Sequence, residues 1–190
     1  MSDVNTVVLV EGVSDKSAVE TLAGRRGRDL AAEGVAVLAM GGATNIGAFV
    51  REYGPAGLGL RLSGLCDVGE VGDYRRHLQF AGFGADLTRD DLEKLGFFVC
   101  VADLEDELIR ALGPDGVERV IDAEGDLRSF RTLQHQPAWR EGDTHAQLRR
   151  FMGSGGGRKI RYSALMVEAL DLDRVPRPLD HLLAHLASTS

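Results

Sequence analysis

Three apolar segments of the chain run directly into acidic residues. Five carboxylates follow these segments along the sequence: Glu11, Asp15, Asp67, Asp103 and Glu105. Where such segments are parallel strands of one sheet, their carboxyl ends meet at a shared crevice, and open α/β sheets place their ligands there. Carboxylates that are packed together repel one another unless a cation lies between them. Because Mg²⁺ prefers oxygen ligands, this set of side chains predicts a magnesium site.

The spacing within this acidic set supports a shared site. A single acid at the end of a strand usually forms a turn or caps a helix, but here three strands end in acids. Asp103 and Glu105 are two positions apart, which places both on one face of an extended segment. Glu11 and Asp15 are four positions apart across a glycine turn, and we expect them to flank one ion.

A basic segment lies in the second half of the chain. Residues 140–161 contain six lysines and arginines and only two acids. Lys159 follows a glycine-rich loop, and helix-start amides with nearby cations can bind phosphate. We expect Lys159 to neutralise charge in a phosphodiester transition state. Four arginines are candidates for contacts with a nucleic-acid backbone, although a solvated helix face is the alternative for the first two: Arg149, Arg150, Arg158 and Arg161.

Two glycine-rich patterns resemble phosphate loops but depart from them. GSGGGRK at residues 153–159 does not satisfy GxxxxGK[ST], because an arginine precedes the lysine and Ile160 follows it. GGATNIG at residues 41–47 is not GxGxxG, and a tight strand–helix turn explains it better than a phosphate contact.

Two further polar groups have simple structural explanations. His181 and His185 share one helix face without further ligands, so we predict surface histidines. Asp106 and Glu107 fall in the first turn of a predicted helix, where acids complement the helix dipole, so we interpret them as capping charges.

The elements that must position these side chains alternate between strand and helix in the first half of the chain. Apolar runs predict strands at residues 7–10, 35–40, 60–66 and 97–102. Helical periodicity and capping residues predict helices at residues 16–25, 45–53, 73–81 and 88–95, the first capped by Ser14 or Asp15. This alternation indicates an α/β fold with a doubly wound parallel sheet.

The second half of the chain has a helical pattern. We predict helices at residues 105–112, 117–123, 144–152, 158–170 and 179–187, and a helix or an irregular segment at residues 127–135. We interpret the 190 residues as one domain, with an α/β core at residues 1–113 and a helical elaboration at residues 114–190 that carries the basic segment.

The composition limits the class of protein. The net charge of −7 and pI near 5.2 argue against a simple basic nucleic-acid coat protein, although bound cations can reverse a local field. Cys66 and Cys100 each lie inside an apolar run, so we predict buried, reduced thiols. The sequence shows neither a signal peptide nor an apolar run of about 18 residues. We therefore expect a cytoplasmic protein without a membrane partner.

Three motifs, taken in order, resemble a Toprim domain. They are VLVEGVSD at residues 8–15, Asp67 at a strand end, and ADLEDEL at residues 102–108. Toprim domains are shared by topoisomerases, primases and nucleases of the OLD (overcoming lysogenization defect) family. Over nearly its whole length the chain is most similar to the OLD-like Toprim domain, including a late lysine in GGGRKIRYSAL.

This resemblance implies a Rossmann-like Toprim fold, in which helices flank a mostly parallel sheet, with a helical C-terminal elaboration. It also implies hydrolysis of DNA phosphodiesters with Mg²⁺ (or Mn²⁺), through a two-metal mechanism. Carried onto this sequence, the motif acids that hold the metals are Glu11, Asp15, Asp67, Asp103 and Glu105. Lys159 matches the catalytic lysine, and we expect Glu11 and Glu105 to act with it in catalysis.

Two departures from the family pattern leave other functions open. The usual Asp-x-Asp reads Asp67-Val68-Gly69-Glu70 here, so Glu70 is a candidate replacement for the missing ligand. OLD proteins also carry an ABC-type ATPase domain, which we expect here only as a separate partner protein; a homodimer is a further expectation. The alternatives are nucleotidyl transfer, hydrolysis of free nucleotides, and a non-catalytic Toprim binding module.

Overall fold

A parallel sheet forms the centre of the protein. The computed structural model describes residues 4–154 and 157–188. Within these residues, four strands are paired in the order β2-β1-β3-β4, and all neighbours are parallel. Their bounds are β1 (Thr6–Val10), β2 (Val35–Ala39), β3 (Arg61–Asp67) and β4 (Phe97–Cys100). The predicted doubly wound α/β sheet is therefore confirmed.

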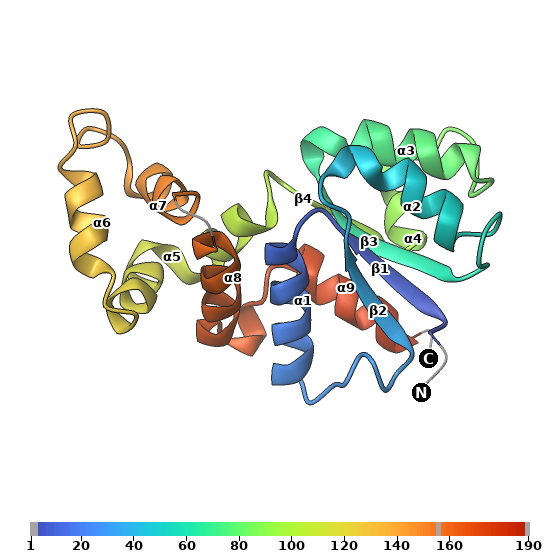
Figure 1. Ribbon diagram of the computed structural model, residues 1–190, viewed down its shortest axis with the longest axis horizontal. Helices are drawn as coiled ribbons and strands as arrows, with labels where there is room; N and C mark the ends of the chain where they lie inside the picture. Colours follow the sequence, from blue (N-terminus) through green and yellow to red (C-terminus); the bar gives the residue numbers. More distant parts are fainter. Residues whose placement is uncertain (1–3, 155–156, 189–190) are drawn as a thin grey trace.

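Helices cover both faces of this sheet (Figure 1). One face carries α2 (Ile46–Tyr53), α3 (Val71–Phe80) and α4 (Arg89–Lys94). The other face carries α1 (Val13–Arg25) and α9 (Arg177–Ser188). In β1, Val8 and Val10 belong to one hydrophobic cluster, whereas Val7 and Leu9 belong to the other. Burial on both faces explains why this strand is apolar at successive positions.

The remaining helices lie beside the sheet, on the side where β4 leads into α5 (Figure 1). They are α5 (Leu104–Ala123), α6 (Leu127–Gln134), α7 (Thr144–Met152) and α8 (Arg158–Ala169). α5 contains both helices predicted at residues 105–123, joined across a kink at Gly113 (φ 70°) and Pro114. The predicted glycine loop before α8 includes residues 155–156, which lie outside the described part.

α1 and α9 are among the helices that begin earlier than the sequence pattern predicts. α1 begins at Val13, because the extended Gly12 is its N-cap residue and its N–H donates to Asp15 Oδ2 at 2.9 Å. The prediction that Ser14 or Asp15 caps a helix from residue 16 was therefore wrong. α9 begins at Arg177, and its proline at the second helical position fits a site that needs no intrahelical N–H donor.

Candidate functional site

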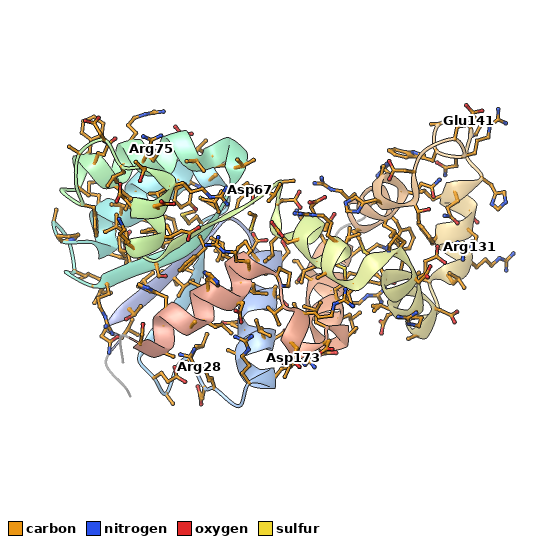
Figure 2. All side chains as sticks on the ribbon, turned by 180° about the vertical axis from the view of Figure 1, so that it is seen from behind. Arg28, Asp67, Arg75, Arg131, Glu141 and Asp173 are labelled. Atoms are coloured by element: carbon orange, nitrogen blue, oxygen red, sulfur yellow. The ribbon has the colours of Figure 1, made fainter. Side chains whose placement is uncertain are left out.

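The sheet brings the predicted acidic residues to one edge. Glu11 and Asp15 follow β1, Asp67 ends β3, and Asp103 and Glu105 follow β4. Because these strands are parallel neighbours, their carboxyl ends lie on the same side. Figure 2 shows Asp67 between the α/β part and the helices beside it.

The charges of these residues act on one another. Burial raises the pKa of Asp67 to about 7, the negative charges of Glu11, Asp103 and Asp15 add to this, and Lys159 opposes it. Burial also raises the pKa of Glu105 to about 7; Lys159 lowers it and Asp103 raises it. Burial is the largest cause of a raised pKa at Asp15 as well. The acidic residues therefore form one electrostatic group.

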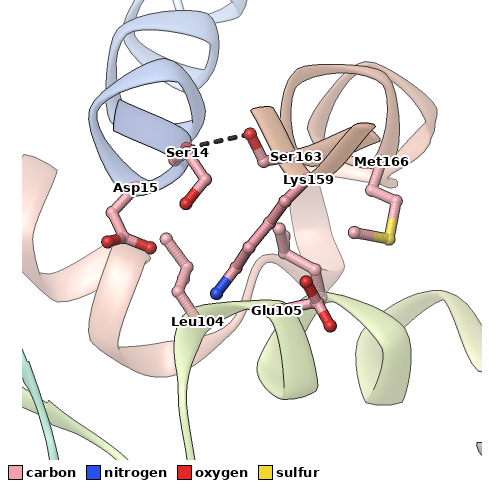
Figure 3. A pocket seen from close by; sticks show the side chains of 8 residues that line it. Ser14, Asp15, Leu104, Glu105, Lys159, Ser163 and Met166 are labelled. Carbon is pink, nitrogen blue, oxygen red and sulfur yellow. Dashed lines mark hydrogen bonds between the residues drawn. The ribbon is translucent and has the colours of Figure 1, made fainter. Parts of the chain in front are cut away.

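Lys159 enters this group from the first turn of α8. Its side chain extends between Asp15 and Glu105 in a pocket that Leu104 and Met166 also line (Figure 3). Ser163 lies one turn after the lysine, and its hydroxyl donates to the Ser14 carbonyl at 2.8 Å. This contact fixes α8 against the start of α1, so the predicted lysine and acids come together.

The set of donors fits a hard divalent cation in its chemistry. All of the candidate ligands are carboxylate oxygens, and a divalent cation would offset the burial and the repulsion that raise the pKa of Asp15, Asp67 and Glu105. Within residues 4–154 and 157–188, however, no three His, Cys, Asp or Glu residues are gathered closely enough to hold a metal ion. In the described residues, the cations that act on these carboxylates include the Lys159 ammonium and the Arg149 guanidinium, which pairs with Asp103.

Glu70 lies in a different setting from the five other acids. A 3-10 turn (Val68–Glu70) follows β3, and Glu70 is the N-cap residue of α3. Its negative charge contributes to the raised pKa of Cys66, but it is not among the main charges that act on Asp67.

The segment after β4 is not extended as the sequence suggests. Asp103 is the N-cap residue of α5, and its Oδ1 accepts from the Asp106 N–H at 2.7 Å. Glu105 is already helical, in the first turn of α5. The expectation that both carboxylates share one face of an extended strand was wrong, although both still belong to the electrostatic group.

Asp106 and Glu107 do more than complement the helix dipole. Asp106 Oδ2 accepts from Arg110 at 2.8 Å, and its Oδ1 lies 2.7 Å from His145 Nε2. Glu107 accepts from the backbone N–H of Val101 at 2.8 Å. Sequence reasoning missed His145, because its partner is 39 positions away and only the packing of α7 on α5 joins them.

The first two candidate arginines have protein contacts. Arg149 pairs with Asp103, and its Nη1 lies 3.6 Å from Asp106 Oδ1. The Arg150 guanidinium lies 6.0 Å from the centre of the Trp139 ring. Arg149 therefore faces the acidic group and is not simply part of a solvated helix face.

The other two candidate arginines stabilise the helical part of the chain. Arg158 donates to the Ser154 carbonyl at 2.8 Å and lies over the Phe151 ring at 4.2 Å. Arg161 forms an ion pair with Asp126 at 2.5 Å. These contacts explain both side chains without a nucleic-acid partner.

The remaining sequence patterns have structural roles. The N–H groups of Gly41 and Gly42 donate to the Glu11 carbonyl at 3.0 and 3.2 Å, which makes the predicted strand–helix turn. His181 and His185 each lie 6.0 Å, edge to face, from a phenylalanine ring of β4. Both histidines are half-buried, so the prediction of surface histidines was wrong.

Two further expectations concern the cysteines and the possibility of a membrane-spanning helix. The two cysteines are buried and are not joined in a disulfide, as predicted. No helix in this part of the chain combines the length and the apolar character needed to cross a membrane.

Comparisons with known proteins agree with this fold. The family model described as "Overcoming lysogenization defect protein-like, TOPRIM domain" matches residues 4–68. No curated protein sequence matches the chain significantly. The C-terminal region of the Burkholderia pseudomallei OLD protein superposes with a TM-score of 0.72 at 20% identity, over 98% of each chain. The C-terminal region of the Xanthomonas campestris pv. campestris OLD protein superposes with a TM-score of 0.69 at 26% identity, over 97% of this chain and 95% of the other. The family model therefore matches about the first third of the chain, and the α/β fold as a whole is similar to that of the C-terminal regions of OLD proteins.

Proposed function

We propose that this protein hydrolyses phosphodiester bonds in DNA with Mg²⁺ (or Mn²⁺) as cofactor. The observation that supports this most directly is the group of mutually repelling carboxylates around Lys159 at the carboxyl edge of the sheet. Structural neighbours that are regions of OLD proteins are consistent with a domain that acts on nucleic acid.

In this proposal, the carboxylates would hold two metal ions. Their candidate ligands are Glu11, Asp15, Asp67, Asp103 and Glu105, with Glu70 as an additional candidate. When bound, such ions supply Lewis acidity to a phosphoryl oxygen and make a water molecule more acidic.

Lys159 and the arginines would act on the substrate. The Lys159 ammonium would stabilise the extra negative charge of the phosphoryl oxygens in the transition state, in a pocket that already excludes part of the solvent. Arg150 is the best candidate for a phosphate contact, because Arg149, Arg158 and Arg161 are engaged by other residues of the chain. Such contacts would make binding sensitive to salt but tolerant of sequence.

Plasmid nicking tests this function. We expect the wild-type protein to nick plasmid DNA with Mg²⁺ or Mn²⁺, and Glu105→Ala and a chelator each to abolish nicking. Glu141→Ala is the matched control, because the Glu141 side chain is 85% exposed and its ion pair in the described residues is with its exposed neighbour Arg140. Nicking that persists in Glu105→Ala at the wild-type rate would contradict the proposed site.

Two alternative functions use the same part of the protein. Nucleotidyl transfer would use the same site with an alcohol in place of water as the nucleophile. A non-catalytic module, which would work with a separate ABC-type ATPase, is favoured by the absence of a gathered ligand shell in the described residues. If calorimetry detects no Mg²⁺ binding at millimolar concentrations, and Glu11→Ala changes nothing, the module is the better description.

A further inference from the structure

Helix α7 contacts the first turn of α5 through two side chains on one face. His145 and Arg149 are four positions apart, so they lie one above the other on the helix. His145 Nε2 lies 2.7 Å from Asp106 Oδ1, and Arg149 Nη1 lies 3.6 Å from the same oxygen. The other end of the same guanidinium, Nη2, pairs with Asp103 Oδ2. One arginine therefore spans two carboxylates of α5.

These carboxylates are enclosed by the protein. The side chain of Asp106 is only 12% exposed, and that of Glu107 only 10%. Arg110 supplies a further cation to both, at 2.8 and 3.1 Å. A buried carboxylate is strongly destabilising when it loses its partners. The contacts from His145 and Arg149 therefore stabilise the start of α5 in this position, together with those from Arg110.

The same contacts fix an acidic residue of the site. Asp103 Oδ1 accepts from the Asp106 N–H, and Asp103 Oδ2 accepts from Arg149, so both of its oxygens are engaged. Glu105 lies two positions further along the same turn and lines the pocket of Lys159. A shift of this turn would therefore move two of the five carboxylates relative to Asp15 and Asp67.

Helix α7 is itself held firmly. Its N-cap Asp143 accepts from the Ala146 N–H at 2.9 Å. Elsewhere on the helix, Leu148 and Phe151 are buried in the core, and the Phe151 ring lies 5.3 Å from that of Phe130. A site is positioned most precisely by side chains on such a packed element.

We propose that His145 and Arg149 are positioning residues, which hold the first turn of α5 so that Asp103 and Glu105 face the other site carboxylates. This inference rests on the proposed function for its catalytic consequence. It gives Arg149 a role different from the backbone contact to DNA that the sequence suggests. Lysine cannot replace this arginine, because one ammonium cannot reach two carboxylates as the planar guanidinium does.

Amide hydrogen exchange tests the positioning directly and needs no activity. We expect His145→Ala, Arg149→Met and Arg149→Lys to accelerate exchange in residues 101–108 by about tenfold or more. His145→Gln should exchange as wild type does, because its amide can still donate to Asp106. Arg128→Met is the matched control, since Arg128 is an exposed arginine of α6 away from these contacts. Unchanged exchange in residues 101–108 of both His145→Ala and Arg149→Met would overturn the proposal.

Kinetics and DNA binding separate positioning from a phosphate contact. For Arg149→Met and His145→Ala we expect kcat to fall by about 10- to 100-fold, with KM for DNA within about threefold of wild type. The slope of log Kd against log salt should stay unchanged. A raised KM at constant kcat, with a slope reduced by about 0.9, would identify Arg149 as a phosphate contact and overturn its positioning role. Lack of cleavage by the wild-type protein would count against the proposed function alone, because hydrogen exchange still decides the positioning.

Discussion

Lys159 is the single residue on which the chemistry of the site depends most. Its ammonium lowers the pKa of Asp15, of Asp67 and of Glu105. No other cation is among the main influences on the pKa of all three carboxyl groups. The side chain is nevertheless exposed, and it makes no ion pair within 4.0 Å in the described part of the chain. The Lys159 side chain therefore contributes positive charge to the pocket and does not stabilise the fold.

We predict that Lys159→Met reduces the rate of DNA cleavage by about 100-fold or more, which corresponds to about 2.7 kcal/mol of lost transition-state stabilisation. The free energy of unfolding should stay within about 0.5 kcal/mol of wild type, because the side chain is exposed. Cleavage assays and urea denaturation measure the two quantities. Lys94→Met, which removes an exposed lysine of α4, should change neither; equal activity of both variants would remove Lys159 from the mechanism.

The sequence predicts some of these residues much better than others. Asp67 and Asp103 could be placed because each directly follows a predicted apolar run, and the carboxyl ends of parallel strands meet at one edge of the sheet. His145 could not, since its contact with Asp106 depends on how two distant helices pack. Arg158 shows the reverse problem: a cation beside a glycine loop suggests phosphate, but its guanidinium donates to Ser154, just after α7.

At the scale of elements, one ion pair joins helices from the two faces of the sheet. Arg177 at the start of α9 donates to both carboxylate oxygens of Glu93 in α4, at 2.9 and 2.7 Å. α4 and α9 both pack against β4, which lies at the edge of the sheet. The pair therefore ties the two helical layers together around an edge strand.

The ion pair between Arg177 and Glu93 makes a contribution to stability that depends on pH. The hydrogen bonds from Arg177 hold the pKa of Glu93 below its ordinary value of 4.5. The stabilisation is therefore fully present above pH 4.5 and is lost as the pH falls through the lowered pKa. We predict that Arg177→Met lowers the free energy of unfolding by about 0.2 to 1 kcal/mol at pH 7.

Urea denaturation across this pH range measures the effect. The difference between Arg177→Met and wild type should disappear as Glu93 is protonated in both proteins. A double-mutant cycle with Glu93→Gln should likewise give a coupling energy at pH 7 that is absent at low pH. A difference that stays constant with pH would show that Arg177 acts through packing.

The elements themselves follow from the sequence where local signals are strong. β1 (Thr6–Val10) begins one residue before the predicted run at residues 7–10, β4 (Phe97–Cys100) lies inside its predicted run, and α7 has its predicted bounds. The start of α1 was misplaced because a glycine serves as N-cap and Asp15 closes the turn from within the helix. A glycine carries no side-chain signal for such a cap, so only the folded backbone reveals it.

At the scale of the whole molecule, one hydrophobic core connects the sheet to the helices beside it. A single cluster of buried residues contains Val8 and Val10 of β1 as well as Phe130, Phe151 and Tyr162 of the helical part. α8 provides the connection, because it packs against both α1 and α5. The candidate site lies at this junction, with acids from the sheet side and Lys159 from α8. We therefore propose that residues 1–190 behave as one domain.

A substitution far from the sheet tests whether the chain unfolds as one domain. Phe151 is 1% exposed, and its ring contacts those of Phe130 and Tyr162 at 5.3 and 6.2 Å. We predict that Phe151→Ala lowers the free energy of unfolding by about 3 to 5 kcal/mol, because it leaves a cavity in the shared core. Trp139, the only tryptophan, reports on the helical part through fluorescence, whereas far-ultraviolet circular dichroism reports on the whole chain.

If the core is continuous, both signals should shift together in wild type and in Phe151→Ala, with one midpoint for each protein. Phe80→Ala is a suitable control, because the Phe80 side chain is 83% exposed and fills no part of the core. A fluorescence midpoint that falls well below the circular dichroism midpoint in Phe151→Ala would show that the helices unfold separately. The site would then be assembled between two independently stable units, and cleavage should be lost at the lower midpoint, when α7 and α8 no longer hold Asp103 and Lys159 in place.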